Sequence, residues 1–272
     1  MSEPFRVLVL AGTREARKLC GTLAAVNGIH TTASLAGVVS SPTEYPVPVI
    51  SGGFGGFRGL ASALQRNRIN LLVDATHPFA AIISVNAIKA AELTAVEIAK
   101  LERPAWQVCG QKDWQEHPSL GEAVRAIPSG SRVFAPLGVG ATRADTITLL
   151  SERQDVEFVM RLIEPPTTAT LPENIVAHIV SRPETEIESE INLLRDHGCT
   201  CLLCRNSGGL GGIAKLQAAA AMGLPVHLVA RPKPAQILPE DRIFSNVSVL
   251  ADWILTLADN DSGDLTTPQN QQ

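Results

Sequence analysis

The fold is decided by residues 71–104, LLVDATHPFAAIISVNAIKAAELTAVEIAKLERP, and residues 202–232, LLCRNSGGLGGIAKLQAAAAMGLPVHLVARP, which follow one plan. Each stretch runs from an apolar strand-like segment through a polar loop into an alanine-rich helical segment. A second strand-like segment and an Arg-Pro pair then follow. Strands that alternate with helices predict a parallel sheet. The repetition predicts that the chain contains two copies of a unit of the nucleotide-binding type.

The repeat extends beyond these two stretches. Residues 7–17, VLVLAGTREAR, match residues 133–145, VFAPLGVGATRAD, because each is an apolar strand that enters a small-residue loop and then Thr-Arg. Downstream, a helix is expected to begin near Ser119 and another near Val247, sixteen residues after the arginine of each Arg-Pro pair. Four blocks in the same order predict an α/β fold with two Rossmann-like domains and mostly parallel sheets.

Chain length and turn signals predict the domain boundaries. The 272 residues suit two domains of about 130 residues each, and both are large enough to bury a core. The PSGS turn near residue 130 is the best boundary. We therefore expect domains at residues 1–128 and 129–258, followed by a polar, disordered tail at residues 259–272.

Composition excludes several classes of partner. Only 4% of residues are aromatic and the formal net charge is −4, so neither base stacking nor a basic field favours nucleic acid or an anionic membrane. The N-terminus lacks a signal-peptide pattern, and no window has the roughly 18 apolar residues of a membrane span. A cytoplasmic protein, monomeric or a small homo-oligomer, is expected.

Three clustered cysteines suggest a metal site, and the spacing argues against it. Cys199, Cys201 and Cys204 lie in a β-rich run, where alternation would put the first two on one face and Cys204 on the other. A structural zinc site usually needs four ligands, and no histidine or fourth cysteine stands close by. No metal is expected.

Two loops of the first half are candidates for contact with a ligand. Gly12, Thr13 and Arg14 form a tight turn into a helix, whose free N–H groups favour an anion, although the turn lacks the G-x-G-x-x-G pattern. The alternative for Arg14 is a solvated residue of the first helical turn. Gly53 lies in the glycine-rich loop SGGFGGF, which we expect beside that turn; a flexible connection is the alternative.

The loop DATHPFA carries the most specific signal. It follows the strand at which a doubly wound sheet reverses direction, and this is where ligands bind. Thr76 and His77 are expected at the exposed strand end, and Pro78 fixes the loop. A similar loop in dihydrodipicolinate reductases lies against the nicotinamide of the cofactor. The alternatives are a capping or merely exposed role for His77 and a structural hydrogen-bond role for Asp74.

The matching loops of the second half favour an anion. The stretch RNSGGLGG leads into Lys215 and places a guanidinium, an amide, a hydroxyl and free N–H groups at one helix start. Gly138 belongs to the first loop of this half and is expected beside that stretch. A glycine-rich turn with the lysine in solvent is the alternative.

In their order and spacing, AGTREAR, SGGFGGFRGL, DATHPFAAIISVNA, LERPAW and the second stretch quoted above resemble the precorrin-6A reductase family over nearly the whole chain apart from the tail. The family usually opens with Gly-Gly-Thr where this chain has Ala11-Gly12-Thr13. The resemblance implies an NADPH-dependent oxidoreductase of cobalamin biosynthesis, which transfers hydride to a carbon–carbon double bond of precorrin-6A. It also implies that the two strand–helix tails, residues 114–127 and 243–255, are exchanged between the domains.

We therefore expect NADPH on the first domain and the carboxylate-rich tetrapyrrole on the second. His77 is the candidate proton donor. An NAD(P)-dependent reductase of another small anionic substrate and a non-catalytic nucleotide sensor are the alternatives. An inverse assignment, with the coenzyme pyrophosphate on RNSGG, is also open. The expected coenzyme residues are Gly12, Thr13, Arg14, Gly53, Thr76, His77, Pro78 and Phe79, and the expected substrate residues are Gly138, Arg143, Arg161, Arg205, Asn206, Ser207, Gly208, Gly209 and Lys215.

Overall fold

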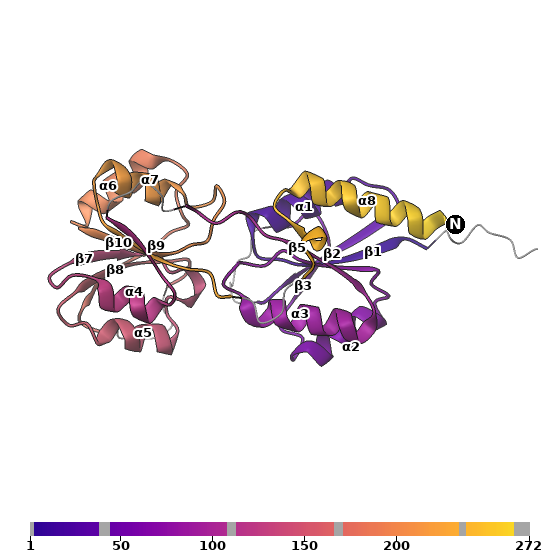
Figure 1. The fold of residues 1–272 in the computed structure, drawn as a ribbon, viewed down its shortest axis with the longest axis horizontal. Helices are drawn as coiled ribbons and strands as arrows, with labels where there is room; N and C mark the ends of the chain where they lie inside the picture. The colour runs from indigo at the N-terminus through magenta and orange to yellow at the C-terminus, as the bar shows by residue number, and fades with distance from the viewer. Residues whose placement is uncertain (1–2, 38–43, 108–112, 166–170, 234–237, 264–272) are drawn as a thin grey trace, which may run out of the picture. The chain divides into compact units, whose positions relative to one another are not determined.

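The computed structural model describes residues 3–37, 44–107, 113–165, 171–233 and 238–263. The chain divides into two compact units, of which unit 1 comprises residues 1–103 and 233–272 and unit 2 comprises residues 104–232. Each unit contains one six-stranded sheet whose paired strands are all parallel, with helices on both faces (Figure 1). The expected α/β fold with two Rossmann-like units is confirmed.

Sheet A belongs to unit 1 and has the strand order β12-β5-β4-β1-β2-β3. Its strands are β1 Phe5–Leu10, β2 Ile29–Leu35, β3 Val49–Ser51, β4 Leu71–Asp74, β5 Glu97–Leu101 and β12 Ile243–Phe244. The helices of unit 1 are α1 Arg14–Ala24, α2 Phe57–Arg66, α3 Ala81–Thr94 and α8 Val247–Gly263, and a short 3-10 helix, Glu240–Arg242, precedes β12.

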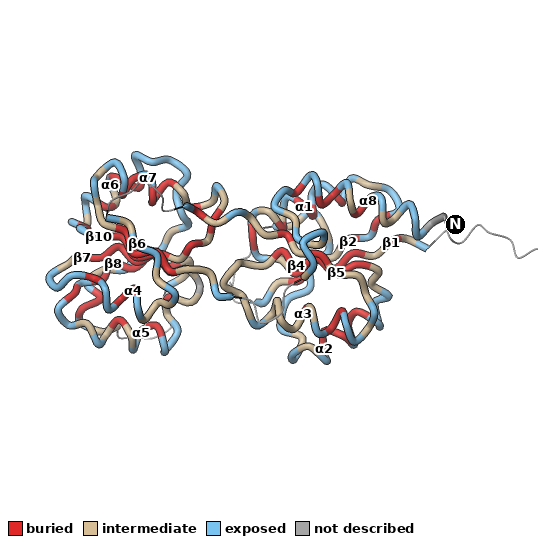
Figure 2. Tube along the Cα trace, viewed as in Figure 1, coloured by how far each residue is buried: buried red, intermediate tan, exposed pale blue. Residues whose placement is uncertain are grey.

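Alternation along the strands gives unit 1 two cores. Val7 and Val9 of β1 pack with α1 and α8 on one face of sheet A. Leu8 and Leu10 point to the other face and pack with α2 and α3. Every residue from Val7 to Leu10 is at most 3% exposed, and Figure 2 shows the buried band along the central strands. This two-sided burial explains why the strand reads as a continuous apolar run.

Sheet B belongs to unit 2 and has the strand order β6-β11-β10-β7-β8-β9. Its strands are β6 Trp114–His117, β7 Arg132–Ala135, β8 Glu157–Leu162, β9 Ile175–Val180, β10 Cys201–Arg205 and β11 Val226–Val229. The helices are α4 Leu120–Ala126, α5 Ala144–Ser151, α6 Ile187–Asp196 and α7 Ala214–Ala221, and a 3-10 helix, Gly138–Gly140, follows β7.

The two sheets confirm the duplication and the exchange of last strands. Replacing β1 to β5 by β7 to β11 converts one strand order into the other, and the sixth strand of each sheet comes from the other half of the sequence. β6 pairs with β11, and β12 pairs with β5. The units therefore change over at residues 103/104 and 232/233, whereas residue 128 was expected, because β6 and α4 precede that residue and belong to unit 2.

The end of the chain differs from the expected tail. α8 continues to Gly263, so residues 259–263 are helical, and residues 264–272 lie outside the described part of the chain. Leu250 and Ile254 anchor this helix because they are fully buried in the core. None of the helices in the described ranges has the length and hydropathy needed to cross a bilayer.

The cysteines occupy the core in a different arrangement from the expected one. Cys199 and Cys204 belong to the same apolar cluster of unit 2, and Cys201 does not. The alternation fails because β10 begins at Cys201, so Cys199 precedes the extended segment. Burial raises the pKa of Cys199 and Cys204 to about 11. Both side chains therefore stay protonated and act as core residues at neutral pH.

Candidate functional site

The carboxyl ends of β1 and β4 form the switch point of sheet A. The two strands are neighbours, and the chain leaves β1 for α1 on one face and β4 for α3 on the other. A crevice at this place is the usual ligand site of doubly wound sheets. The structure therefore brings the turn after β1, with Gly12, Thr13 and Arg14, and the DATHPFA loop after β4 together at the carboxyl ends of the strands, as the sequence predicted.

Thr13 joins the two loops of this edge. It is the N-cap of α1, where its Oγ1 accepts a hydrogen bond from the Ala16 N–H at 3.1 Å. The same hydroxyl donates to the carbonyl of Ala75 at 2.8 Å. Thr13 is 8% exposed, so its hydroxyl positions the turn. Gly12 has φ +125°, a conformation that favours glycine, and Arg14 begins α1 on the exposed side.

The DATHPFA loop is ordered by its own side chains. Asp74 is 2% exposed and accepts hydrogen bonds from the Thr76 N–H at 3.1 Å and hydroxyl at 2.6 Å, which supports the structural role considered for it. His77 Nδ1 accepts from the Phe79 N–H at 3.2 Å, which puts the ring proton of the neutral form on Nε2. α3 then begins without a side-chain N-cap hydrogen bond. The loop therefore presents the half-buried His77, Pro78 and Phe79 beside an uncapped helix start.

A small pocket lies between the loops after β1, β4 and β5. It brings together Thr13, Thr76 and Pro78 from the expected coenzyme residues. The sequence interpretation missed Glu15, Glu102 and Arg103, which also line it. Arg103 Nη1 lies 2.8 Å from Glu15 Oε2, so the acid in the first turn of α1 is neutralised. The repeated Arg-Pro pair was the available signal, because it places Arg103 two residues after the end of β5.

A cation lies on the β2 side of the β1 turn. The Arg17 guanidinium stands over the Tyr45 ring, 5.5 Å from its centroid. The Tyr45 hydroxyl accepts a 3.3 Å hydrogen bond from the Gly12 N–H, and burial raises the pKa of this phenol. The buried Nε of Arg17 has no hydrogen-bond partner among the described residues. This arrangement fits an anionic group outside β2.

The glycine-rich loop with Gly53 is farther from the turn than expected. It follows the edge strand β3, and β2 lies between β3 and β1. The expected adjacency is therefore wrong, because sequence alone did not place the third strand at the edge. Gly59 fixes the loop against α2, since a Cβ there would lie 1.6 Å from the Phe54 carbonyl oxygen.

Unit 2 has two arginines at the carboxyl ends of β7 and β10, which correspond to β1 and β4 of unit 1. A Cβ on Gly140 would lie 2.7 Å from Arg205 Nη2, so the guanidinium packs against the loop that contains Gly138, as expected. Burial and the nearby Arg143 lower the pKa of Arg205. Arg143 is exposed, with its Nε 3.3 Å from Asp145. Two close guanidiniums in a partly desolvated place favour an anion.

The rest of the RNSGGLGG loop bonds to the segment around Trp106, with which unit 2 begins. Asn206 is 2% exposed; it accepts from the Trp106 N–H at 2.8 Å and donates to the Trp106 carbonyl at 3.0 Å and to Glu116 at 2.9 Å. Trp106 Nε1 donates to the Gly209 carbonyl at 2.7 Å. The buried Lys215 donates to the Gly212 carbonyl at 2.6 Å and stands 4.6 Å over the Trp106 ring. This placement does not support a ligand role for Asn206 or Lys215.

The remaining positions of the loop have similar constraints. Gly208 has φ +69°, and a Cβ there would lie 2.1 Å from the Pro104 carbonyl oxygen. The Gly209 N–H donates to that oxygen at 3.1 Å, and the Ser207 carbonyl accepts from Arg231 at 3.1 Å. The glycines thus permit a close approach of two backbone segments within unit 2.

Arg161 lies inside unit 2. Its guanidinium is 3% exposed and its Nη1 lies 2.7 Å from Oε1 of Glu190, which is fully buried. It also stacks 5.0 Å over the Phe134 ring. The structure therefore argues against the expected contact of Arg161 with a substrate. An apolar strand with a single arginine did not reveal its acidic partner on α6.

Residues 6–255 match the family model for precorrin-6x reductase CbiJ/CobK. The chain is 35% identical over 253 residues to a precorrin-6A reductase from Rhodococcus erythropolis, which covers 93% of this chain and 98% of the relative. A precorrin-6A reductase from Rhodobacter capsulatus is 37% identical over 84% of this chain and 88% of its own. A solved structure named CobK precorrin-6A reductase superposes with a TM-score of 0.83 at 35% identity, covering 93% of this chain and 96% of that one. The chain belongs to the precorrin-6x reductase CbiJ/CobK family.

Proposed function

We propose that this protein is an NADPH-dependent precorrin-6A reductase of cobalamin biosynthesis. The observation that carries the proposal is the family match over residues 6–255, joined to a doubly wound unit with a polar crevice at its switch point. The four described cysteines are free thiols, which fits a reducing, cytoplasmic compartment.

We assign the coenzyme to unit 1. The uncapped start of α3 and the N–H groups of the β1 turn suit phosphate oxygens, and the half-buried His77, Pro78 and Phe79 offer a surface for a ring. Bound NADPH would supply the hydride. The inverse assignment is disfavoured, because the Asn206 amide and the Gly209 carbonyl of the RNSGG loop bond to Trp106, and the Gly209 N–H bonds to the Pro104 carbonyl. The proposed coenzyme residues are Gly12, Thr13, Arg14, Thr76, His77, Pro78 and Phe79.

Arg17 supports the choice of NADPH over NADH. Enzymes that prefer NADPH commonly place an arginine near the end of the second strand, where it meets the 2′-phosphate. Arg17 stands over Tyr45, which belongs to the connection between β2 and β3, and its buried Nε has no hydrogen-bond partner among the described residues. Arg17→Met should raise KM for NADPH by about 10-fold or more, for a lost charge-assisted contact of about 1.5–3 kcal/mol, and leave KM for NADH nearly unchanged. Equal effects on both coenzymes would contradict this role.

We assign the tetrapyrrole to the edge of unit 2. Carboxylates of the macrocycle would pair with Arg143 and Arg205, and the 3-10 turn with Gly138 allows close approach of backbone. Ser207 contributes its hydroxyl from the same loop. The buried Arg161, Asn206 and Lys215 position unit 2 itself.

His77 is the proposed proton donor. Its Nδ1 is engaged by the Phe79 N–H, so Nε2 is the atom that carries a transferable proton. Water or a substrate carboxyl group is the alternative source.

Anaerobic oxidation of NADPH in the presence of precorrin-6A tests the proposed function. We expect loss of NADPH absorbance coupled to a change in the macrocycle chromophore. A protein that binds NADPH tightly and leaves both spectra unchanged would contradict the reductase assignment and would favour a nucleotide-binding sensor.

A further inference from the structure

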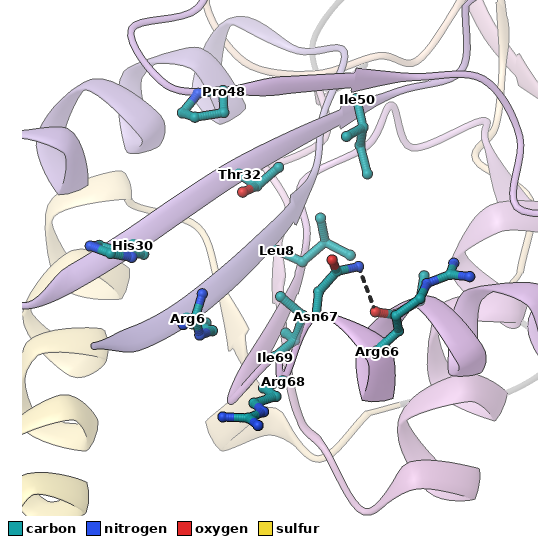
Figure 3. Close-up of a pocket in the computed structure, with 11 residues that line it drawn as sticks. Arg6, Leu8, His30, Thr32, Pro48, Ile50, Arg66, Asn67, Arg68 and Ile69 are labelled. Atoms are coloured by element: carbon teal, nitrogen blue, oxygen red, sulfur yellow. Dashed lines mark hydrogen bonds between the residues drawn. The ribbon is translucent and has the colours of Figure 1, made fainter. Parts of the chain in front are cut away.

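An open cavity of about 500 Å³ lies on the α2 side of sheet A, away from the switch-point loops. Figure 3 shows it over β1 and β2, with Leu8 and Thr32 on the sheet and Ile50 on the edge strand. On this face of sheet A, α2 and α3 pack against Leu8, Leu10 and Leu72, and their cluster includes no residue of β2 or β3. The described helices therefore leave the cavity open over these two strands. Its size is that of a small-molecule site.

The polar groups of this cavity are mainly cationic. Arg6, His30, Arg66 and Arg68 line it, and the described lining residues include no carboxylate. Arg68 Nη1 lies 2.9 Å from Glu3, but both side chains are 70% exposed. Such an exposed pair holds the guanidinium by at most about 1 kcal/mol, so a stronger anionic partner can displace Glu3.

The duplicated unit supplies an internal reference for this charge. Arg6 pairs in register with His30, across β1 and β2. At the equivalent place of unit 2, Arg132 pairs in register with Glu157, and its Nε lies 2.7 Å from the carboxylate. Unit 2 therefore neutralises its arginine, whereas unit 1 has an imidazole where the acid would stand.

The end of α2 shows the same difference. Arg68 follows the helix with φ +50°, and the Ile69 N–H bonds back to the Leu64 carbonyl at 2.9 Å. In unit 2, Gly198 occupies this position with φ +60°, before the equivalent bond from Cys199 to Leu194. Glycine is the usual residue there, because a side chain in the left-handed region costs about 1 kcal/mol.

The helix end also changes charge. Arg66 stands two residues before Arg68, and Asp196 stands two residues before Gly198. Unit 1 thus has three arginines and a histidine at the four positions that unit 2 fills with one arginine, two acids and a glycine. Folding requires neither the left-handed arginine nor the concentrated positive charge, since the same architecture forms without them.

We propose that this cavity is a second ligand site of the protein, which binds an organic polyanion with an apolar body and carboxylate or phosphate groups. The apolar floor contacts the body of the ligand, and the three guanidiniums pair with its acidic groups in the bidentate geometry that both kinds of oxyanion accept. The site lies toward the amino ends of β1 and β2, so its ligand does not compete with a coenzyme at their carboxyl ends.

Binding of pyrenetetrasulfonate, followed by fluorescence anisotropy at saturating NADP⁺, tests this proposal. The probe has a flat apolar body and several negative charges, and NADP⁺ occupies the proposed coenzyme site. We expect saturable binding that weakens by about tenfold or more in each of His30→Glu and Arg66→Glu. The first variant places a carboxylate beside Arg6, as Glu157 stands beside Arg132 in unit 2, and the second loses a charge-assisted contact. Arg58→Glu is the matched control on α2, because Arg58 does not line the cavity; its affinity should stay within about twofold.

Arg68→Gly separates binding from folding. Glycine relieves the left-handed residue, so the variant should be as stable as the parent or more so, and it should still lose about fivefold or more in probe affinity. Displacement by benzenehexacarboxylate or by inorganic pyrophosphate identifies which acid group is preferred. The proposal is overturned if no probe binds at saturating NADP⁺, if neither acid displaces it, or if all four variants bind it equally.

Discussion

Replacing Glu190 with alanine tests whether Arg161 is structural. The substitution removes Glu190, the acidic partner of a guanidinium that is 3% exposed, and with it the acceptor of the Glu184 N–H at 3.1 Å. Breaking one side of a buried ion pair costs about 3–5 kcal/mol. With a urea m value of about 1–3 kcal/mol/M, the unfolding midpoint of unit 2 should fall by about 2 M.

The double variant Arg161→Met with Glu190→Leu decides between structure and substrate binding. Nε and Nη2 of Arg161 and Oε2 of Glu190 are buried without hydrogen-bond partners among the described residues, so the pair does not fully recover its desolvation cost. Apolar replacements of similar volume should therefore restore stability to within about 1–2 kcal/mol of the parent or exceed it. Urea unfolding measures this, and anaerobic NADPH oxidation should give parental kcat/KM. Restored stability with a large loss of kcat/KM would refute the structural role.

Three further predictions concern the loops and unit 2. His77→Ala should lower kcat by about 10²-fold with little change in NADPH affinity, as for a lost proton donor; parental steady-state kinetics would remove His77 from the reaction. Burial and then His117 lower the pKa of His227 to about 4, so the unfolded state binds more protons between pH 4 and 6.5. The stability of unit 2 should fall on acidification through that window, and His227→Gln should flatten the dependence in pH-dependent urea unfolding; an unchanged pH profile would contradict it. Gly208→Ala should cost about 2 kcal/mol or more because it meets the Pro104 carbonyl, and an unchanged melting temperature would show that the two segments do not touch.

Local rules explain what could be predicted from the sequence. The apolar runs predicted β1, β4, β10 and β11, and the tight turn at Gly12 and Thr13 leads into a helix as predicted. The repeated spacing also placed the starts of α4 and α8 correctly. β9 was missed because its residues, IVAHIV, lie between Pro172 and Pro183, and no strand was predicted in that stretch.

Contacts between distant residues explain what could not be predicted. Asn206 and Lys215 have the chemistry of an anion site, yet the structure gives them protein partners. Asn206 bonds to Trp106, and Lys215 bonds to the Gly212 carbonyl and stacks over the Trp106 ring. Sequence gives no sign that a segment 100 positions earlier fills this loop. The same holds for Arg161, because its acidic partner Glu190 lies 29 positions later on α6 and could not be identified from the sequence.

Hydride transfer itself tests the central claim most directly. NADPH carrying deuterium at nicotinamide C4 should be incubated anaerobically with precorrin-6A and the enzyme, and the tetrapyrrole analysed by mass spectrometry. Two preparations of the coenzyme are used, each labelled on one face of the nicotinamide. We predict that the reduced macrocycle contains one deuterium when the label is on the face from which hydride is transferred. A macrocycle that remains unreduced, or that is reduced without deuterium from either labelled face, would contradict the assignment of the protein as an NADPH-dependent precorrin-6A reductase.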